Sequence, residues 1–269
     1  MAEYRNLHVI PLSLFILMPV TFVITYFIAV FWDHVHPTLP YISETGAFSP
    51  ESCIFAQFLN IAALLLLCWV YIRHRQISKF SELQPENRVS NTANNLATIF
   101  GIIGCIGLDV VANFQESRSV GIHMIGAMTC FAATNIYFCM QTVFSCNLRP
   151  YINSLRMIYI RAVINFLSVA FTVSTVLPGS ISMQQFNGTD YKKWLPSDGG
   201  WHWHMTSVIS EYFLTLSFCA YLLTFVHEFR RIHFYSPEIE LNLEMKSKDT
   251  VSKKNLEVNL STDSNGYKS

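Results

Sequence analysis

Six apolar stretches, each about as long as a bilayer is thick, constrain this chain more than any other feature of its sequence. They run approximately over residues 8–32, 53–72, 96–114, 122–144, 157–177 and 205–226. A helix rises about 1.5 Å per residue, so about 20 residues cross roughly 30 Å of hydrocarbon, where unpaired backbone groups are too costly to leave exposed. The sequence therefore predicts an all-α, polytopic membrane protein with six transmembrane helices.

Composition agrees with this prediction. The residues AVILMFWYC make up 51% of the chain and DEKR only 13%, against about 25% charged residues in a typical soluble domain. The first stretch is longer than the h-region of a secretory signal, and it ends in Phe31-Trp32-Asp33 without a small-residue cleavage site. We therefore expect it to remain as the first transmembrane helix.

The zero net charge hides a strong asymmetry between the two faces of the membrane. If the N-terminus is cytosolic, fourteen of the eighteen Lys and Arg residues are cytosolic, and only Arg118, Lys192 and Lys193 lie on the exoplasmic face. The positive-inside rule then places both termini in the cytosol. Arg161 lies near the cytosolic end of the fifth helix and is expected to snorkel toward the headgroups.

The chain divides into a six-helix transmembrane domain, residues 1–234, and a tail, residues 235–269. The tail is rich in Glu, Lys, Ser and Asn, and such a segment cannot bury enough apolar surface to fold. We expect it to be a disordered cytosolic segment.

Residues 73–95 are expected to form a polar cytosolic loop. The short connection over residues 115–120 predicts that helices three and four form an antiparallel hairpin, with glycines and alanines at their contact.

Asp109 is a carboxylate inside the third apolar stretch, and such groups often have a function. It lies about 20 Å along its helix from the cytosolic end, too far in depth from Arg161 to pair with it. The partners we expect are Asn113, His123 and Glu211. Two interpretations stay open, an ion or proton role for Asp109 and a hydrogen-bonded structural carboxyl.

Five of the nine histidines are expected at the exoplasmic ends of helices: His34, His36, His123, His202 and His204. They could sense an acidic lumen, since imidazole titrates near pH 6.5. Trp201-His202-Trp203-His204 also fits an interfacial aromatic belt. No HxxxH spacing supports a zinc site, and there is no GxSxG, SxxK or HExxH motif. We therefore predict no catalytic residues, no metal and no cofactor, and expect that the protein is not an enzyme.

Four segments carry a resemblance to a known family. They are Pro40-Tyr41-Ile42-Ser43-Glu44-Thr45-Gly46, Ser49-Pro50-Glu51, Phe58-Leu59-Asn60-Ile61-Ala62-Ala63 and Gly107-Leu108-Asp109-Val110-Val111-Ala112-Asn113-Phe114-Gln115. With the order and spacing of the six helices, these segments resemble the Frag/DRAM/Sfk family over about residues 8–234. Within that family the chain looks most like the damage-regulated autophagy modulators, the DRAM proteins.

The resemblance implies a non-enzymatic, multi-pass protein that promotes autophagy at lysosomal or late endosomal membranes. It also leaves alternatives, because the family includes members linked to glycosylphosphatidylinositol lipid remodelling and to recruitment of a phosphoinositide kinase at the plasma membrane. A lipid-handling or proton-coupled transporter built around Asp109 is the second interpretation. The tail has no good tyrosine-based or acidic dileucine sorting signal, so the Golgi and the plasma membrane stay open as locations. The resemblance offers no catalytic residues to carry over.

The expected partners are membrane lipids and, through the tail, cytosolic proteins, with no nucleic acid. The sequence does not determine an oligomeric state.

Glu44, Thr45 and Gly46 form the candidate functional loop on the exoplasmic, or lumenal, face. We expect a tight turn in which Gly46 supplies positive φ, followed by a helix start with Ser49 as N-cap and Pro50 at the first helical position. Ordering of the loop and direct ligand contact are both compatible with this pattern.

The sequon Asn187-Gly188-Thr189 tests the topology, because it lies in the connection that the charge asymmetry places on the exoplasmic side. Treating the expressed protein with an N-glycosidase should increase its electrophoretic mobility, and Asn187→Gln should abolish that shift. The second sequon, Asn259-Leu260-Ser261, is cytosolic in this orientation and should stay unmodified. A glycan that persists in Asn187→Gln, or one on Asn259, would show that the predicted orientation is wrong.

Overall fold

The structure, a computed structural model, describes residues 3–235 and contains six helices long and apolar enough to cross a membrane. In chain order the helices are α1 (Val9–Phe31), α2 (Glu51–Leu83), α3 (Asn91–Asn113), α4 (Glu116–Asn147), α5 (Leu155–Gln185), α6 (Trp201–Leu223) and the short α7 (Val226–Phe229). Short 3-10 helices lie in the connections at Glu44–Gly46, Pro85–Asn87, Tyr191–Lys193 and Pro196–Asp198. The chain is therefore an all-α, multi-pass membrane protein, as predicted.

The helices belong to one compact unit, residues 5–232. A second unit contains two short strands, β1 (Glu3–Tyr4) and β2 (Phe234–Tyr235), which pair antiparallel with Glu3 opposite Tyr235. Of the predicted cytosolic tail only its first residue, Tyr235, is described, and residues 236–269 lie outside the described part of the chain.

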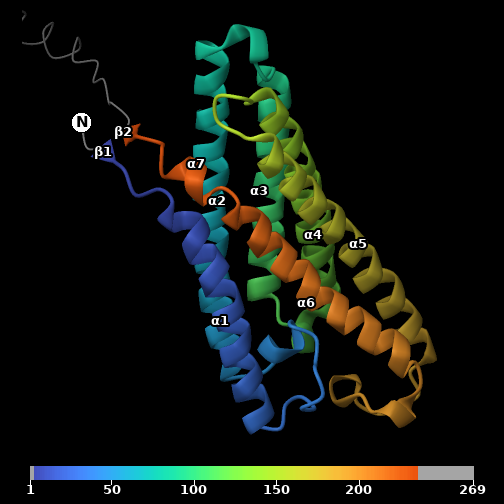
Figure 1. The fold of residues 1–269 in the computed structure, drawn as a ribbon. Coiled ribbons are helices and arrows are strands. Elements are labelled where there is room, and N and C mark those ends of the chain that lie inside the picture. The colour runs from blue at the N-terminus through green and yellow to red at the C-terminus, as the bar shows by residue number, and fades with distance from the viewer. Residues whose placement is uncertain (1–2, 236–269) are drawn as a thin grey trace, which may run out of the picture. The chain divides into compact units, whose positions relative to one another are not determined.

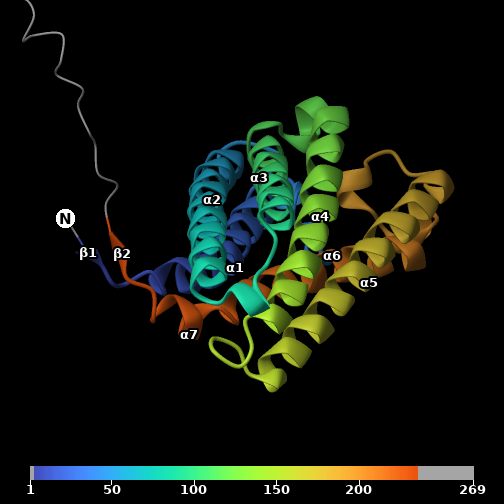
Figure 2. The same cartoon turned by 90° about the horizontal axis from the view of Figure 1, so that it is seen from above.

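The six long helices form a closed ring in sequence order. Each packs against the next, and α6 returns to contact α1. Figures 1 and 2 show α2, α3 and α4 side by side, and α5 paired with α6. In both views α4 and α5 lie close at the loop that joins them and diverge toward their other ends. Following the predicted orientation, we call the end with the α4–α5 loop the cytosolic end and the opposite end the exoplasmic end.

Three helices are clearly longer than the hydropathy pattern predicted: α2, α5 and α4, which begins at Glu116 rather than near residue 122. α2 continues through residues 73–83, which were expected to be loop, because Ile77 and Phe80 bury their side chains and no helix breaker occurs before Pro85. α5 continues through Pro178 to Gln185, although its apolar stretch was expected to end at Leu177. A hydropathy pattern reports where a helix meets lipid, and a helix can continue beyond that region.

Local hydrogen bonds determine where several helices begin and end. α1 ends in a Schellman motif, since the N–H of His34 bonds to the carbonyl of Ala29 at 2.9 Å and Asp33 adopts positive φ. Ser90 and Ser154 act as N-caps of α3 and α5, because their hydroxyls accept the free N–H groups of Ala93 and Met157.

The α3–α4 hairpin confirms the predicted contact between small residues. Only Phe114 and Gln115 separate the two helices, and a Cβ at Gly107 would meet the backbone of Cys130. A Cβ at Gly126 would meet the side chain of Val110. The two backbones therefore approach as closely as the absence of side chains allows.

An aromatic cluster fills the cytosolic half of the ring. The fully buried Trp69 of α2 stands edge-on to Phe225, with ring centroids 4.9 Å apart, and stacks on Phe229 at 5.7 Å. Phe138 of α4 stacks on Tyr221 of α6 at 3.9 Å. These rings join α2, α4, α6 and α7 through direct aromatic contacts.

Beside this cluster, the Glu228 carboxylate binds two fully buried arginines. Its Oε2 accepts from Nη1 of Arg73 at 2.9 Å, and its Oε1 accepts from Nη2 of Arg161. Arg161 also donates to Ser145, Asn153 and Thr224, and Arg73 donates to Gln141 and Gln76. The prediction that Arg161 snorkels is therefore wrong, because the bundle supplies it with a full set of acceptors, and Arg73 is not a loop residue. This cluster ties together α2, α4, α5 and α7.

Replacing Glu228 tests how much the fold depends on this cluster. Glu228→Gln leaves two guanidinium groups buried without a counter-charge, which should cost about 3–5 kcal/mol. The purified protein should then unfold at a clearly lower temperature than wild type. Glu82→Gln is the matched control, because Glu82 pairs with Lys79 at 2.8 Å on the surface, where solvent screening makes an ion pair contribute little to stability. Equal unfolding temperatures for the two variants would contradict the assigned role of Glu228.

Candidate functional site

The exoplasmic connection between α1 and α2 folds inward over the end of the ring. Glu44, Thr45 and Gly46 form a 3-10 helix, and all three residues are buried. The Thr45 hydroxyl lies 2.9 Å from that of Thr25 on α1 and donates to the Ile42 carbonyl at 2.7 Å. The predicted exoplasmic loop is therefore part of the protein interior rather than an exposed surface.

Distant helices hold this connection in place. The backbone N–H of Ile42 donates to Glu211 of α6 at 2.7 Å, and the Ser43 hydroxyl donates to Glu116 of α4 at 3.1 Å. The Tyr212 hydroxyl donates to the Pro40 carbonyl at 3.1 Å. The segment from Pro40 to Gly46 thus connects α1, α4 and α6 at the exoplasmic end.

Gly46 has a different role from the one the sequence suggested. Gly199 and Gly200 are the glycines with positive φ in the described part of the chain, so Gly46 does not need that conformation. A Cβ at Gly46 would instead overlap the ring of Phe55 on α2. The predicted helix start is also shifted, since α2 begins at Glu51 with Pro50 at the N-cap position and no cap from Ser49.

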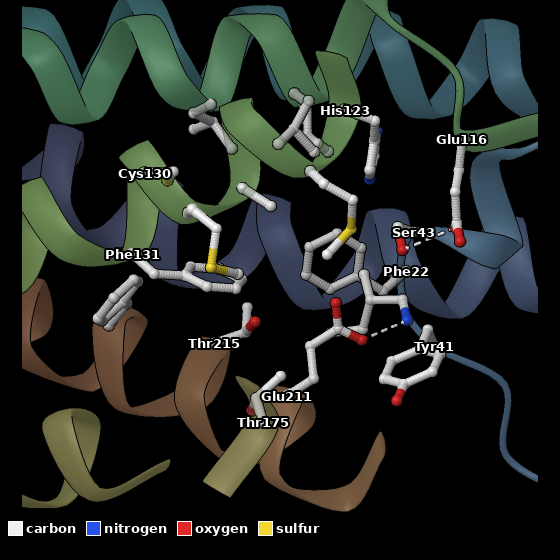
Figure 3. A pocket seen from close by; sticks show the side chains of 18 of the residues that line it. Phe22, Tyr41, Ser43, Glu116, His123, Cys130, Phe131, Thr175, Glu211 and Thr215 are labelled. Atoms are coloured by element: carbon white, nitrogen blue, oxygen red, sulfur yellow. Dashed lines mark hydrogen bonds between the residues drawn. The ribbon is translucent and has the colours of Figure 1, made fainter. Parts of the chain in front are cut away.

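A cavity of about 610 Å³ occupies the centre of the ring beneath this connection. Its walls are mainly apolar, and its lining includes Phe22, Cys130, Phe131 and Thr215, which Figure 3 labels. Along α4 the lining extends from Glu116, past the non-helical Ser119, to Phe138. The helical part from Val120 to Phe138 is about 27 Å long at 1.5 Å per residue. The volume falls within the range of about 300–1,000 Å³ that is typical of small-molecule sites.

The exoplasmic end of the cavity is polar. Three carboxylates line it, those of Glu44, Glu116 and Glu211, together with Ser43 and Tyr41. Figure 3 shows Glu211 with one oxygen bonded to the backbone near Tyr41 and the other free in the cavity. Among the described residues none of the three carboxylates forms an ion pair.

The electrostatics at this end disfavour an ionised Glu44. Burial, and next the charge of Glu116, hold the pKa of Glu44 well above its ordinary value, and the hydrogen bond from the Tyr41 N–H offsets this only in part. Lys192 is the nearby cation, but its ammonium group donates to the Tyr191 hydroxyl at 2.6 Å and lies over the Tyr191 ring. Burial likewise raises the pKa of Tyr41.

Asp109 lies apart from this site. Its side chain is exposed on α3 and accepts from Asn113 at 3.2 Å, and Asn113 exchanges two hydrogen bonds with Asn60 of α2. Asn113 was one of its expected partners. The other two, His123 and Glu211, bond instead to the backbone at Phe114 and Ile42. Asp109 does not line the cavity.

The histidines at the exoplasmic end have separate surroundings. His34 lies 2.5 Å from Glu51, His204 stacks on Trp194 at 4.3 Å, and His202 is exposed. Within residues 3–235 no three His, Cys, Asp or Glu side chains come together in a way that could hold a metal ion. The histidine side chains at this end therefore pack and pair separately rather than converge.

The predicted glycosylation sequon lies in the α5–α6 connection. Asn187 is exposed, and its backbone N–H donates to the Asp198 carbonyl at 2.8 Å. Gly199 and Gly200 turn the chain into α6 with φ of 78° and 64°, and a Cβ on either would collide with carbonyls of α5. Lys193 in the same connection bonds to Asp33 at 2.7 Å, which lowers the pKa of that exposed carboxyl.

Sequence analysis missed Glu116 and Glu211 as cavity residues. Glu211 entered only as a possible partner for Asp109. A signal for it was present, because a carboxylate ten residues into the sixth apolar helix is as costly in lipid as Asp109 is. For Glu116 no such signal existed, since it is the first residue of a helix beside a polar connection.

Comparisons with known proteins agree with one another on the family to which this chain is similar. The family model described as "Frag1/DRAM/Sfk1/Cwh43P N-terminal domain" matches residues 6–232. DNA damage-regulated autophagy modulator protein 2 of Homo sapiens is 33% identical over 242 residues, which is 89% of each chain. DNA damage-regulated autophagy modulator protein 1 of Homo sapiens is 32% identical over 231 residues, 85% of this chain and 93% of that protein. Modulator of macroautophagy TMEM150B-B of Xenopus laevis is 39% identical over 111 residues, covering 41% and 45%. No solved structure matches significantly.

Glu44 should make the stability of the protein depend on pH. Because its folded-state pKa lies above the ordinary value of 4.5, its contribution to stability is fully present below that pH and is lost as pH rises through the folded pKa. The unfolding temperature of wild type should therefore fall as pH rises above the ordinary value of 4.5. Glu44→Gln mimics the neutral carboxyl and keeps the acceptor for Tyr41, so it should flatten this dependence.

The matched control for this titration is Glu86→Gln, at an exposed position in the α2–α3 connection. It should leave the pH dependence of the unfolding temperature as in wild type. If the unfolding temperature of Glu44→Gln depended on pH as strongly as that of wild type, the assignment of a neutral carboxyl to Glu44 would be wrong.

Proposed function

The chain belongs to the Frag1/DRAM/Sfk1 family, and on that premise we propose that it promotes autophagy at lysosomal or late endosomal membranes without itself catalysing a reaction. The observation that carries this proposal is the similarity to autophagy modulators along 85–89% of the chain. The match includes the transmembrane unit. The proposed activity therefore belongs to the helical ring rather than to an added domain.

The site described above supports binding more than chemistry. Its carboxylates anchor the exoplasmic connection through Ile42 and Ser43, and they lie in a mainly apolar cavity rather than beside a nucleophile. In this proposal the connection from Pro40 to Gly46 gives the exoplasmic face its shape. The tail remains the proposed contact for cytosolic partners.

Of the alternative functions, a transporter built around Asp109 receives no support from the geometry, because the exposed Asp109 does not line the cavity. A lipid-handling role is favoured by the cavity itself and is developed in the next subsection. Recruitment of a phosphoinositide kinase at the plasma membrane, and residence in the Golgi, have no specific observation in their favour.

Autophagic flux tests the main proposal. Raising the level of the protein should increase lipidated autophagosome marker, measured with and without lysosomal inhibition. Gly46→Val should blunt the increase, because the new side chain would collide with Phe55 and displace the exoplasmic connection. Gly121→Val is the matched control, since a Cβ there meets nothing within 4 Å.

Two outcomes would contradict the proposal. One is an unchanged flux on both overexpression and deletion, with the protein confined to the plasma membrane, which would favour the kinase-recruiting alternative. The other is an equal loss of autophagic flux in Gly46→Val and Gly121→Val at equal protein levels. That result would show that the connection near Gly46 has no specific role in the activity.

A further inference from the structure

The cavity has an opening toward the membrane. Three of its lining residues are about half exposed: Val120 (51%) and Met124 (46%) on α4, and Met183 (55%) on α5. All three lie in the exoplasmic halves of these helices, where α4 and α5 diverge (Figures 1 and 2). An apolar molecule in the exoplasmic leaflet can therefore reach the cavity from the side, without crossing water.

The other end of the cavity is closed by the aromatic cluster. Phe138 and Leu222 form its cytosolic floor, and both are buried. The walls between the floor and the polar end include Leu14, Met18 and Phe131, which offer no hydrogen-bonding groups. A long hydrocarbon chain lying along α4 would be in contact with apolar side chains over its whole length.

The polar end gathers three carboxyl groups that have no ion-pair partner among the described residues. Glu44, Glu116 and Glu211 come from three different elements, and His123 on α4 uses its Nδ1 to bond the Phe114 carbonyl. Lys192, the nearby cation, is held by Tyr191. The free oxygen of Glu211 faces the cavity (Figure 3). Carboxylates in such surroundings are stabilised by a cation that enters among them.

We propose that this cavity binds one amphiphile with a cationic amine headgroup and a long apolar tail, taken up from the exoplasmic leaflet between α4 and α5. The headgroup lies among Glu44, Glu116 and Glu211, and the tail extends toward Phe138. An anionic headgroup would find no free cation among these side chains, since Lys192 is held by Tyr191. The inference names a ligand class for the lipid-handling role, and it does not depend on the role in autophagy.

Photo-crosslinking with defined probes tests the proposal on the purified full-length protein. The probe is a single-chain primary amine of eighteen carbons, chosen for its length, with a diazirine in the tail. A fatty acid and a fatty alcohol with the same tail are the comparison probes. The amine should label peptides of α4 and α5 most strongly. Unlabelled long-chain amine should compete with it, and spermine, an amine without a tail, should not.

Two pairs of variants separate the headgroup from the tail. Glu211→Gln keeps the acceptor for the Ile42 N–H but removes the charge, and it should weaken amine labelling about tenfold; the exposed Glu86→Gln should not. Thr215→Trp fills the cavity and should abolish labelling, whereas Leu216→Trp, its exposed neighbour on α6, should not. If Thr215→Trp does not fold, Ala127→Phe fills the same space from α4.

Equal labelling by the three probes, or full labelling in the filled variants, would overturn the proposal. Competition by spermine would also overturn it, because it would show that the tail is not recognised. An autophagic flux that is unaffected by Glu211→Gln leaves the binding result standing, so the failure of one proposal can be told from the failure of the other.

Discussion

A single carboxylate between two arginines organises the cytosolic end of this protein. Glu228 of α7 accepts from Arg73 of α2 and Arg161 of α5, and the arginines also donate to Gln141 of α4 and to Thr224, just after α6. A buried charge is tolerated only when it is paired and its hydrogen bonds are satisfied. The positions of four helices are therefore coupled, because a shift of any one would leave a guanidinium or the carboxylate without a partner.

The space inside the ring is filled differently at its two ends. At the cytosolic end, Trp69, Phe225 and Phe229 fill the space beside the ionic cluster. Toward the exoplasmic end α4 and α5 diverge (Figures 1 and 2). The Pro40–Gly46 connection folds over this end of the ring and bonds to α4 and α6. The cavity lies between the two.

The carboxylates of the cavity serve two purposes at once. Glu211 and Glu116 hold the connection through Ile42 and Ser43 while facing the cavity. The conformation of the connection and the polarity of the cavity are therefore linked by the same groups. Gly46 belongs to this arrangement, since it lets the connection approach Phe55 closely enough for Thr45 to reach Thr25.

The sequence by itself determined the six membrane-spanning helices and the α3–α4 hairpin with its small residues, because these follow from length, hydropathy and local pattern. It did not determine that α2 and α5 extend past their apolar stretches, that Arg161 is buried, or that Glu44, Glu116 and Glu211 meet. Glu44 and Glu211 are 167 positions apart in the chain, and whether a charged side chain faces lipid, water or another charge depends on neighbours that only the packing of the helices supplies. Tertiary structure thus decided the cavity and its charge.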